Sequence, residues 1–183
     1  MLSSNRSRQR GITLLESLVS IAVLAVAVLG MLGVQLRLLA ETQTGVRRGQ
    51  AVRLIEDFSE RIKTNPGSYS QIGAYVSDFT ATVPQPTVDC ATTNCLPEEL
   101  ALWDLAKWKA NVAQILPLGQ ANLFLSTDEA TSTNRRQLGI IVAWKKNEAS
   151  DSDDYKTPFL PRAVVEGIEC PATHLCHLVY VQP

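Results

Sequence analysis

Apolar and polar positions are distributed most unevenly at the N-terminal end of this 183-residue chain. From Ile12 to Val34 the sequence runs for 23 residues with a single charged side chain, Glu16. At about 1.5 Å per helical residue this run measures about 34 Å, which is enough to cross a hydrocarbon core about 30 Å thick. The pattern predicts a membrane-spanning helix over residues 12–34.

A helical pattern continues beyond the apolar run. Apolar side chains recur at three- and four-residue intervals with charged residues between them, which is typical of a helix that buries one face. Asn65-Pro66-Gly67 then provides a stop signal. We therefore expect one helix from about Thr13 to Thr64, whose continuation over residues 35–65 packs on a globular domain over residues 66–183. The apolar positions of this continuation are Ala51, Leu54, Ile55, Phe58 and Ile62.

The globular part contains a second helix, predicted over Pro97–Leu116. Proline suits the first turn of a helix, and Glu98 and Glu99 suit the positive end of its dipole. Its apolar stripe is expected to be buried, which makes core packing the favoured role of Trp108 over a ligand platform formed with Trp103. The stripe comprises Ala101, Leu105, Trp108, Val112 and Ile115.

Short apolar and alternating segments follow or precede this helix, and they predict β-strands. Successive strands after a helix favour a mainly antiparallel sheet, so the expected class is α+β. The predicted strands are Tyr75–Val83, Ala121–Ser126, Leu138–Lys146, Arg162–Glu169 and His177–Val181.

Charge and cysteine content indicate the compartment. Arg6, Arg8 and Arg10 precede the apolar run without an acidic residue, so the N-terminus is expected in the cytoplasm and the rest of the chain outside it. The four cysteines then lie on the translocated side, where an even number favours disulfides. Three pairings are possible. We favour the local bridges because each would tie down a short segment: Cys90–Cys95 and Cys170–Cys176.

The carboxylate of Glu16 decides between three interpretations of the N-terminus, because an unpaired charge in hydrocarbon costs several kcal/mol. A secretory signal peptide cut at Ala25-Val26-Ala27 leaves the charge inside its apolar core. A plain signal anchor explains the length of the run but not the charge. The third interpretation explains both features.

The stretch Gly11-Ile12-Thr13-Leu14-Leu15-Glu16 closely resembles the type III signal of type IV pilins and pseudopilins. The resemblance implies that residues 1–11 are a leader, that a prepilin peptidase cuts between Gly11 and Ile12, and that the new N-terminus is methylated. Glu16 then occupies the fifth mature position, where the family carries a glutamate. Ile12 departs from the phenylalanine that most often begins the mature chain.

Physical chemistry agrees with this resemblance. Cleavage would convert Ile12 into a free amine close to hydrocarbon, about one helical turn from Glu16. In a filament the amine of one subunit could pair with Glu16 of a neighbour, so that packing neutralises two costly charges together. Removing one member of a buried ion pair typically costs several kcal/mol.

The segment "CATTNCLPEELALWDLAKWKANVAQILPLG" resembles minor pilins of the PilV type, also called type IV pilus modification proteins. The resemblance implies a pilin fold, a long N-terminal helix packed on a mainly antiparallel sheet. It implies a minor pilin that is anchored in the bacterial inner membrane, has a periplasmic domain and helps to initiate a type IV pilus. The expected partners are other major and minor pilins, prepilin peptidase, the inner-membrane assembly machinery and membrane lipid. The alternative is a pseudopilin of a type II secretion system.

Other chemistry finds little support in the sequence. A formal net charge of -1 without a basic stripe gives no reason to expect nucleic-acid binding. No phosphate loop, nucleophile elbow or zinc-protease motif occurs, so we expect neither enzyme activity nor a cofactor.

Three weaker patterns each allow an interpretation without a functional role and one with a functional role. His174 and His177 beside Cys170 and Cys176 match no familiar zinc spacing, so a disulfide with two surface histidines is favoured. The acidic run 151–154 lacks the spacing of an EF-hand loop, and a solvated loop is favoured over calcium binding. Gly45-x-x-x-Gly49 permits close helix packing, although ordinary tolerance of glycine is the favoured interpretation.

Overall fold

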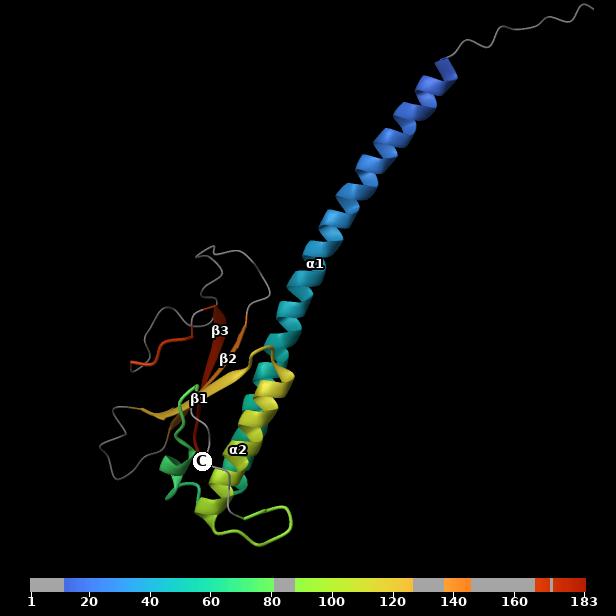
Figure 1. Cartoon of the computed structure of the whole chain (residues 1–183). Coiled ribbons are helices and arrows are strands. Elements are labelled where there is room, and N and C mark those ends of the chain that lie inside the picture. The colour runs from blue at the N-terminus through green and yellow to red at the C-terminus, as the bar shows by residue number, and fades with distance from the viewer. Residues whose placement is uncertain (1–11, 81–87, 127–136, 146–166, 172) are drawn as a thin grey trace, which may run out of the picture. The chain divides into compact units, whose positions relative to one another are not determined.

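The computed structural model describes residues 12–80, 88–126, 137–145, 167–171 and 173–183. Its longest element is α1, Ile12–Thr64, which confirms the predicted single helix. The chain divides into two compact units within α1, residues 1–43 and 44–183, and each is described by itself. Figure 1 shows the order of the elements.

The second unit contains a three-stranded antiparallel sheet with the order β1-β2-β3. The strands are β1, Gln120–Leu125; β2, Leu138–Lys145; and β3, His174–Val181. In the register, Leu123 lies opposite Ile140 and Ile140 lies opposite Val179. A long N-terminal helix with a small antiparallel sheet agrees with the expected α+β pilin fold.

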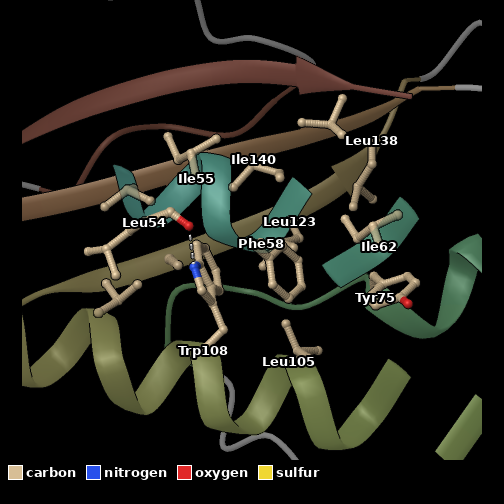
Figure 2. Close-up of a cluster of buried hydrophobic side chains, with 14 of the residues drawn as sticks. Leu54, Ile55, Phe58, Ile62, Tyr75, Leu105, Trp108, Leu123, Leu138 and Ile140 are labelled. Carbon is tan, nitrogen blue, oxygen red and sulfur yellow. Dashed lines mark hydrogen bonds between the residues drawn. The ribbon is translucent and has the colours of Figure 1, made fainter. Parts of the chain in front are cut away.

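The C-terminal part of α1 enters the main core. All five predicted apolar positions from Ala51 to Ile62 are buried. Phe58 is central, since its ring stacks on Trp108 with centroids 4.4 Å apart and meets Tyr75 edge-on at 5.8 Å. Figure 2 shows these rings between α1 and α2, together with Leu123 and Ile140 from the sheet.

Polar contacts between α1 and α2, Pro97–Ile115, supplement this packing. The Trp108 indole N–H donates to the Leu54 carbonyl oxygen at 2.7 Å, drawn as a dashed line in Figure 2. The Arg61 guanidinium pairs with Asp104 at 3.1 Å and with Asp57 at 2.9 Å. Burial raises the pKa of Asp104, and the hydrogen bond from Arg61 opposes that rise. The two helices are therefore joined by apolar and polar contacts along the same faces.

The C-terminal end of α1 is closed by the side chain of Asn65, which is 1% exposed. Its amide nitrogen donates to the Tyr75 hydroxyl at 2.9 Å and to the Pro97 carbonyl at 2.8 Å. Its amide oxygen accepts from the Gly67 N–H at 3.0 Å. One side chain therefore connects the helix end with the following turn and with the start of α2.

The apolar stripe of α2 is buried as predicted at four positions, Ala101, Leu105, Trp108 and Val112. The prediction for Ile115 is wrong, because this side chain is 47% exposed. The helix ends at Ile115, and Leu116 adopts an extended conformation that turns its own side chain into the core at 2% exposure. The change of backbone conformation shifts the buried position by one residue.

The predicted strand Tyr75–Val83 is also wrong over its described part. Ile72–Tyr75 forms a 3₁₀ helix, η1, and the extended segment after it pairs with β1 only at Ser77 and Leu123. Tyr75 and Ser77 are nevertheless buried while Val76 is exposed, so the alternation reflects burial against the core without a ladder of hydrogen bonds. Residues 81–83 lie outside the described residues.

The remaining strand predictions agree with β1, β2 and β3 to within a few residues, with one exception. Most of the predicted strand Arg162–Glu169 lies outside the described residues. Its described end belongs to none of the named strands, and Gly167 has a positive φ of 84°.

The second face of the sheet carries a smaller cluster formed by Phe124, Ile141, Ala143 and Cys176. Phe124 lies over Gly139, where any Cβ atom would overlap its ring. The cysteines are paired locally, Cys90 with Cys95 and Cys170 with Cys176. This is the pairing favoured on sequence grounds, and it links the smaller cluster to the segment before β3.

Candidate functional site

The first unit presents an apolar helical surface that no described part of the chain covers. Every described side chain from Leu14 to Leu39 is exposed. Among the described residues, α1 is the one helix long and apolar enough to cross a membrane, judged by length and composition. The large apolar side chains concerned include Leu14, Leu18, Ile21, Leu24, Leu29 and Leu36, each at least 66% exposed.

Charges delimit this surface at both ends. Glu16 lies at the start, and Arg37 lies at the end, paired with Glu41 at 3.2 Å one turn further along. The 20 residues from Ser17 to Leu36 carry no charge and measure about 30 Å as a helix, close to the thickness of a hydrocarbon core. The geometry suits a bilayer or the apolar interior of an assembly.

Glu16 is positioned by the first turn of α1. The helix begins at Ile12, so Glu16 lies about 6 Å along the axis from that end, where unbonded backbone N–H groups favour negative charge. The Glu16 carbonyl oxygen accepts a 2.8 Å hydrogen bond from the Ser20 hydroxyl, and the Glu16 side chain is exposed. Gly11 and the rest of the predicted leader, residues 1–11, lie outside the described residues.

Sequence reasoning singled out Glu16 but missed Ser20. The signal was available, because Ser20 follows Glu16 by four residues and such pairs share one helix face. A serine hydroxyl in a helix commonly returns to the carbonyl four residues earlier. The polar character of this helix end therefore extends over a full turn.

The glycines of α1 lie in open surroundings within the chain. A Cβ atom added at Gly30, Gly33, Gly45 or Gly49 would meet nothing within 4 Å. None of these positions is needed for packing inside the described protein. They provide flat places on the helix where another chain can approach closely.

The cysteine–histidine pattern near the C-terminus does not form a zinc ligand set. Cys170 and Cys176 are bonded to each other, so neither sulfur is a free thiolate that could bind zinc. His174 and His177 are three residues apart on β3 and therefore lie on opposite faces. Burial, followed by the nearby positive charge of Arg48, lowers the pKa of His177.

The two tryptophans of α2 have different surroundings. Trp108 is fully buried, as expected for core packing. Trp103 is half-buried, and the Lys107 ammonium lies 5.6 Å from its ring centroid. A cation over an aromatic face at a surface is worth about 0.5–1 kcal/mol, which accounts for this pair without a ligand. The acidic run 151–154 lies outside the described residues.

Comparison with protein families finds two matches that together begin before the apolar helix and end inside α2. Residues 6–32 match the prokaryotic N-terminal methylation motif. Residues 33–106 match the family described as Type IV pilin Tt1218. The two matches support a type IV pilin. No curated protein and no solved structure matches the chain.

The match to the methylation motif covers Gly11, Ile12 and Glu16, together with most of the exposed apolar surface. A prepilin-like motif followed by such a helix is the arrangement of a membrane-anchored pilin. The pilin match covers the Cys90–Cys95 disulfide and the first half of α2. The pilin family is structural rather than enzymatic, and its members interact with other pilus components and with prepilin peptidase.

Proposed function

We propose that this pilin is a minor subunit of a bacterial type IV pilus, of the PilV type, which helps to initiate the filament. Residues 1–11 are the leader, residues 12–34 the membrane and filament-core helix, residues 35–65 its amphipathic continuation, and residues 66–183 the periplasmic domain. Before assembly the N-terminus faces the cytoplasm and the chain crosses the inner membrane once.

The observation that carries this proposal is an exposed apolar helix with one carboxylate close to its start. The segment from Ser17 to Leu36 is long enough to span hydrocarbon, and none of the described residues of its own chain covers it. Glu16 lies one turn from Ile12, the residue that cleavage after Gly11 would expose as an amine. Pairing between the amine of one subunit and Glu16 of another would remove both charges from an apolar environment.

The minor-pilin assignment draws on the middle of the chain. The PilV resemblance covers the Cys90–Cys95 loop, the whole of α2 and the following turn. By this analogy the protein joins other minor pilins in a complex that starts the filament, and its disulfide-braced domain meets those subunits. Deletion of the gene is expected to reduce surface piliation and twitching. A secretion defect with normal piliation would instead identify a pseudopilin of a type II secretion system.

Processing is tested by the mass of the N-terminal peptide of the protein isolated from its own bacterium. We expect the chain to begin at Ile12 and to carry one added methyl group. Recovery of the protein with residues 1–11 attached, or cut after Ala27, would contradict the proposal.

Assembly is tested with Glu16→Ala. We expect normal cleavage and at least a tenfold loss of this chain from sheared filaments, because losing one partner of a desolvated ion pair costs several kcal/mol. Glu41→Ala is the matched control, since Glu41 lies on the same helix in an exposed surface pair with Arg37. Normal incorporation of Glu16→Ala would refute the role of Glu16.

A further inference from the structure

The polar side chains near the start of α1 lie on one side of the helix. At about 100° per residue, Glu16, Ser17 and Ser20 fall within an arc of about 100°. Leu18 and Ala22 lie on the opposite side, and from Ile21 to Val34 every side chain is apolar or glycine. Up to Val34, the exposed helix therefore has a polar face only over its first turns.

Ser20 is prepared to accept a further hydrogen bond. Its hydroxyl donates its proton to the Glu16 carbonyl at 2.8 Å, which lets the side chain reside in hydrocarbon without an unpaired donor. The hydroxyl oxygen can still accept a hydrogen bond from another group. An ionised carboxylate has no proton to donate and can only accept hydrogen bonds. Glu16 and Ser20, four residues apart, thus present two acceptors as neighbours on one face.

This chain provides no cation for those acceptors within its described first unit. Among its described residues, 12–43, the basic side chain is Arg37, which is 21 positions from Glu16 and about 32 Å away along the helix. Arg37 is itself paired with Glu41. After processing, the Ile12 amine of the same chain would lie about 12 Å along the helix from Ser20, so a cation that contacts both Glu16 and Ser20 must come from another chain.

We propose that Ser20 acts with Glu16 as a two-point acceptor for the cationic chain end of a neighbouring pilin subunit. This inference rests on the proposed function, because processing supplies that cation. A protonated amine carries more than one N–H donor, and in hydrocarbon each donor needs an acceptor. Glu16 neutralises the positive charge of the amine. Ser20 accepts a hydrogen bond from an N–H group of the amine that the carboxylate does not bind. The small side chain of Ser17, on the flank of the face that carries Glu16 and Ser20, leaves room for the neighbouring subunit to approach.

The first test measures the amount of the full-length chain in sheared filaments relative to the amount in the membrane. Ser20→Ala is expected to lower this ratio about threefold, the effect of losing an average interhelical hydrogen bond in a bilayer. Ser20→Thr keeps the hydroxyl and is expected to retain the wild-type ratio. Ser20→Leu adds bulk and is expected to lower the ratio more than Ser20→Ala does.

Ala22→Leu is the matched control, because it adds bulk about 160° around the helix from Ser20. We expect it to assemble normally. An equal loss with Ala22→Leu and Ser20→Leu would show that bulk matters on every face and would overturn the assignment.

A second measurement identifies the group that Ser20 contacts. A photo-crosslinking side chain placed at position 20 is expected to capture the first residues of another processed pilin, identified by mass spectrometry, whereas the same probe at position 22 is not. Capture of a different pilin segment at position 20 would overturn the proposal.

The two proposals fail separately. If Glu16→Ala abolishes incorporation while Ser20→Ala and Ser20→Leu assemble normally, the role of Ser20 is wrong and that of Glu16 stands. If Glu16→Ala also assembles normally, both proposals fall.

Discussion

The Trp108 indole N–H donates a 2.7 Å hydrogen bond to the main-chain carbonyl of Leu54, a residue 54 positions earlier in the chain. The same indole stacks on Phe58 one turn further along α1. A single side chain of α2 is therefore fixed to α1 by both a polar contact and a ring contact.

Replacement of Trp108 tests this attachment. Trp108→Ala is expected to lower the free energy of unfolding by about 3–5 kcal/mol through a cavity in the core. Trp108→Phe keeps a ring but loses the hydrogen bond, so a loss of about 1–2 kcal/mol is expected. Trp103→Ala, on the same helix but half-buried, should cost less than about 1 kcal/mol. Urea unfolding of the detergent-solubilised chain, followed by circular dichroism, measures each value.

Acidification is expected to destabilise the second unit through His177. Burial and the charge of Arg48 lower the pKa of His177 below its ordinary value of 6.5. At a pH between the lowered pKa and 6.5, His177 binds a proton more readily in the unfolded chain than in the folded chain. Its contribution to the free energy of unfolding is therefore fully present above pH 6.5 and is lost as the pH falls through that range.

His177→Gln should flatten this pH dependence in unfolding measurements between pH 5 and pH 8. His174→Gln, on the same strand, is the control and should leave the dependence in place. An unchanged slope in His177→Gln would contradict the assignment.

The two disulfides are expected to contribute different amounts to the stability of the folded chain. Each closes a short loop, which predicts about 2 kcal/mol from restriction of the unfolded chain. Cys176 is also buried beside Ile141 and Ala143, whereas Cys90 and Cys95 are more exposed. The double replacement of Cys170 and Cys176 by serine should therefore lower the midpoint of thermal unfolding more than that of Cys90 and Cys95.

Peptide mapping without reduction checks the pairing itself. It should recover one peptide pair containing Cys90 and Cys95 and another containing Cys170 and Cys176. A peptide that joins Cys90 to Cys176 would show that the pairing is wrong.

Glycine substitutions should distinguish a packed position of the second unit from an open one. Gly139→Ala forces a Cβ atom into the Phe124 ring and is expected to cost about 1–3 kcal/mol. Gly49→Ala adds a methyl group in open space on a helix and should stabilise the chain by about 0.5–1 kcal/mol. Thermal unfolding measures both effects. Destabilisation of the isolated chain by Gly49→Ala would contradict the open surroundings at that position.

The sequence predicted the helices well because their signals are local. An unbroken apolar run, a 3.6-residue period and Asn65-Pro66-Gly67 define α1, and Pro97 with two glutamates defines the start of α2. Apolar alternation also located β1, β2 and β3. These signals depend on neighbouring residues and need no knowledge of the rest of the fold.

The errors arose where tertiary contacts override a local pattern. Tyr75 and Ser77 alternate with Val76 in burial, but only Ser77 finds a hydrogen-bonding partner in β1, so the pattern of a strand occurs without a strand. Leu116 replaces Ile115 in the core because the backbone changes direction at the end of α2. A helical period continued past Ile115 cannot predict that change of backbone direction.

The candidate site was only partly predictable for a different reason. Glu16 stands out because a charge in an apolar run is rare and costly. Ser20 does not stand out, since a lone serine in such a run is common and its hydroxyl is satisfied by its own helix. The proposed role of Ser20 depends on contact with a second subunit, and no pattern in the sequence of one subunit predicts that contact.

Asn65 has a mechanical consequence for a subunit held by the opposite end of its long helix. Its amide binds the Tyr75 hydroxyl and the Pro97 carbonyl, so the last turn of α1 is coupled to two later segments at a single point. A tensile load along the helix would reach both segments through these two hydrogen bonds. Asn65→Ala should therefore lower the force at which the later segments separate from the end of α1.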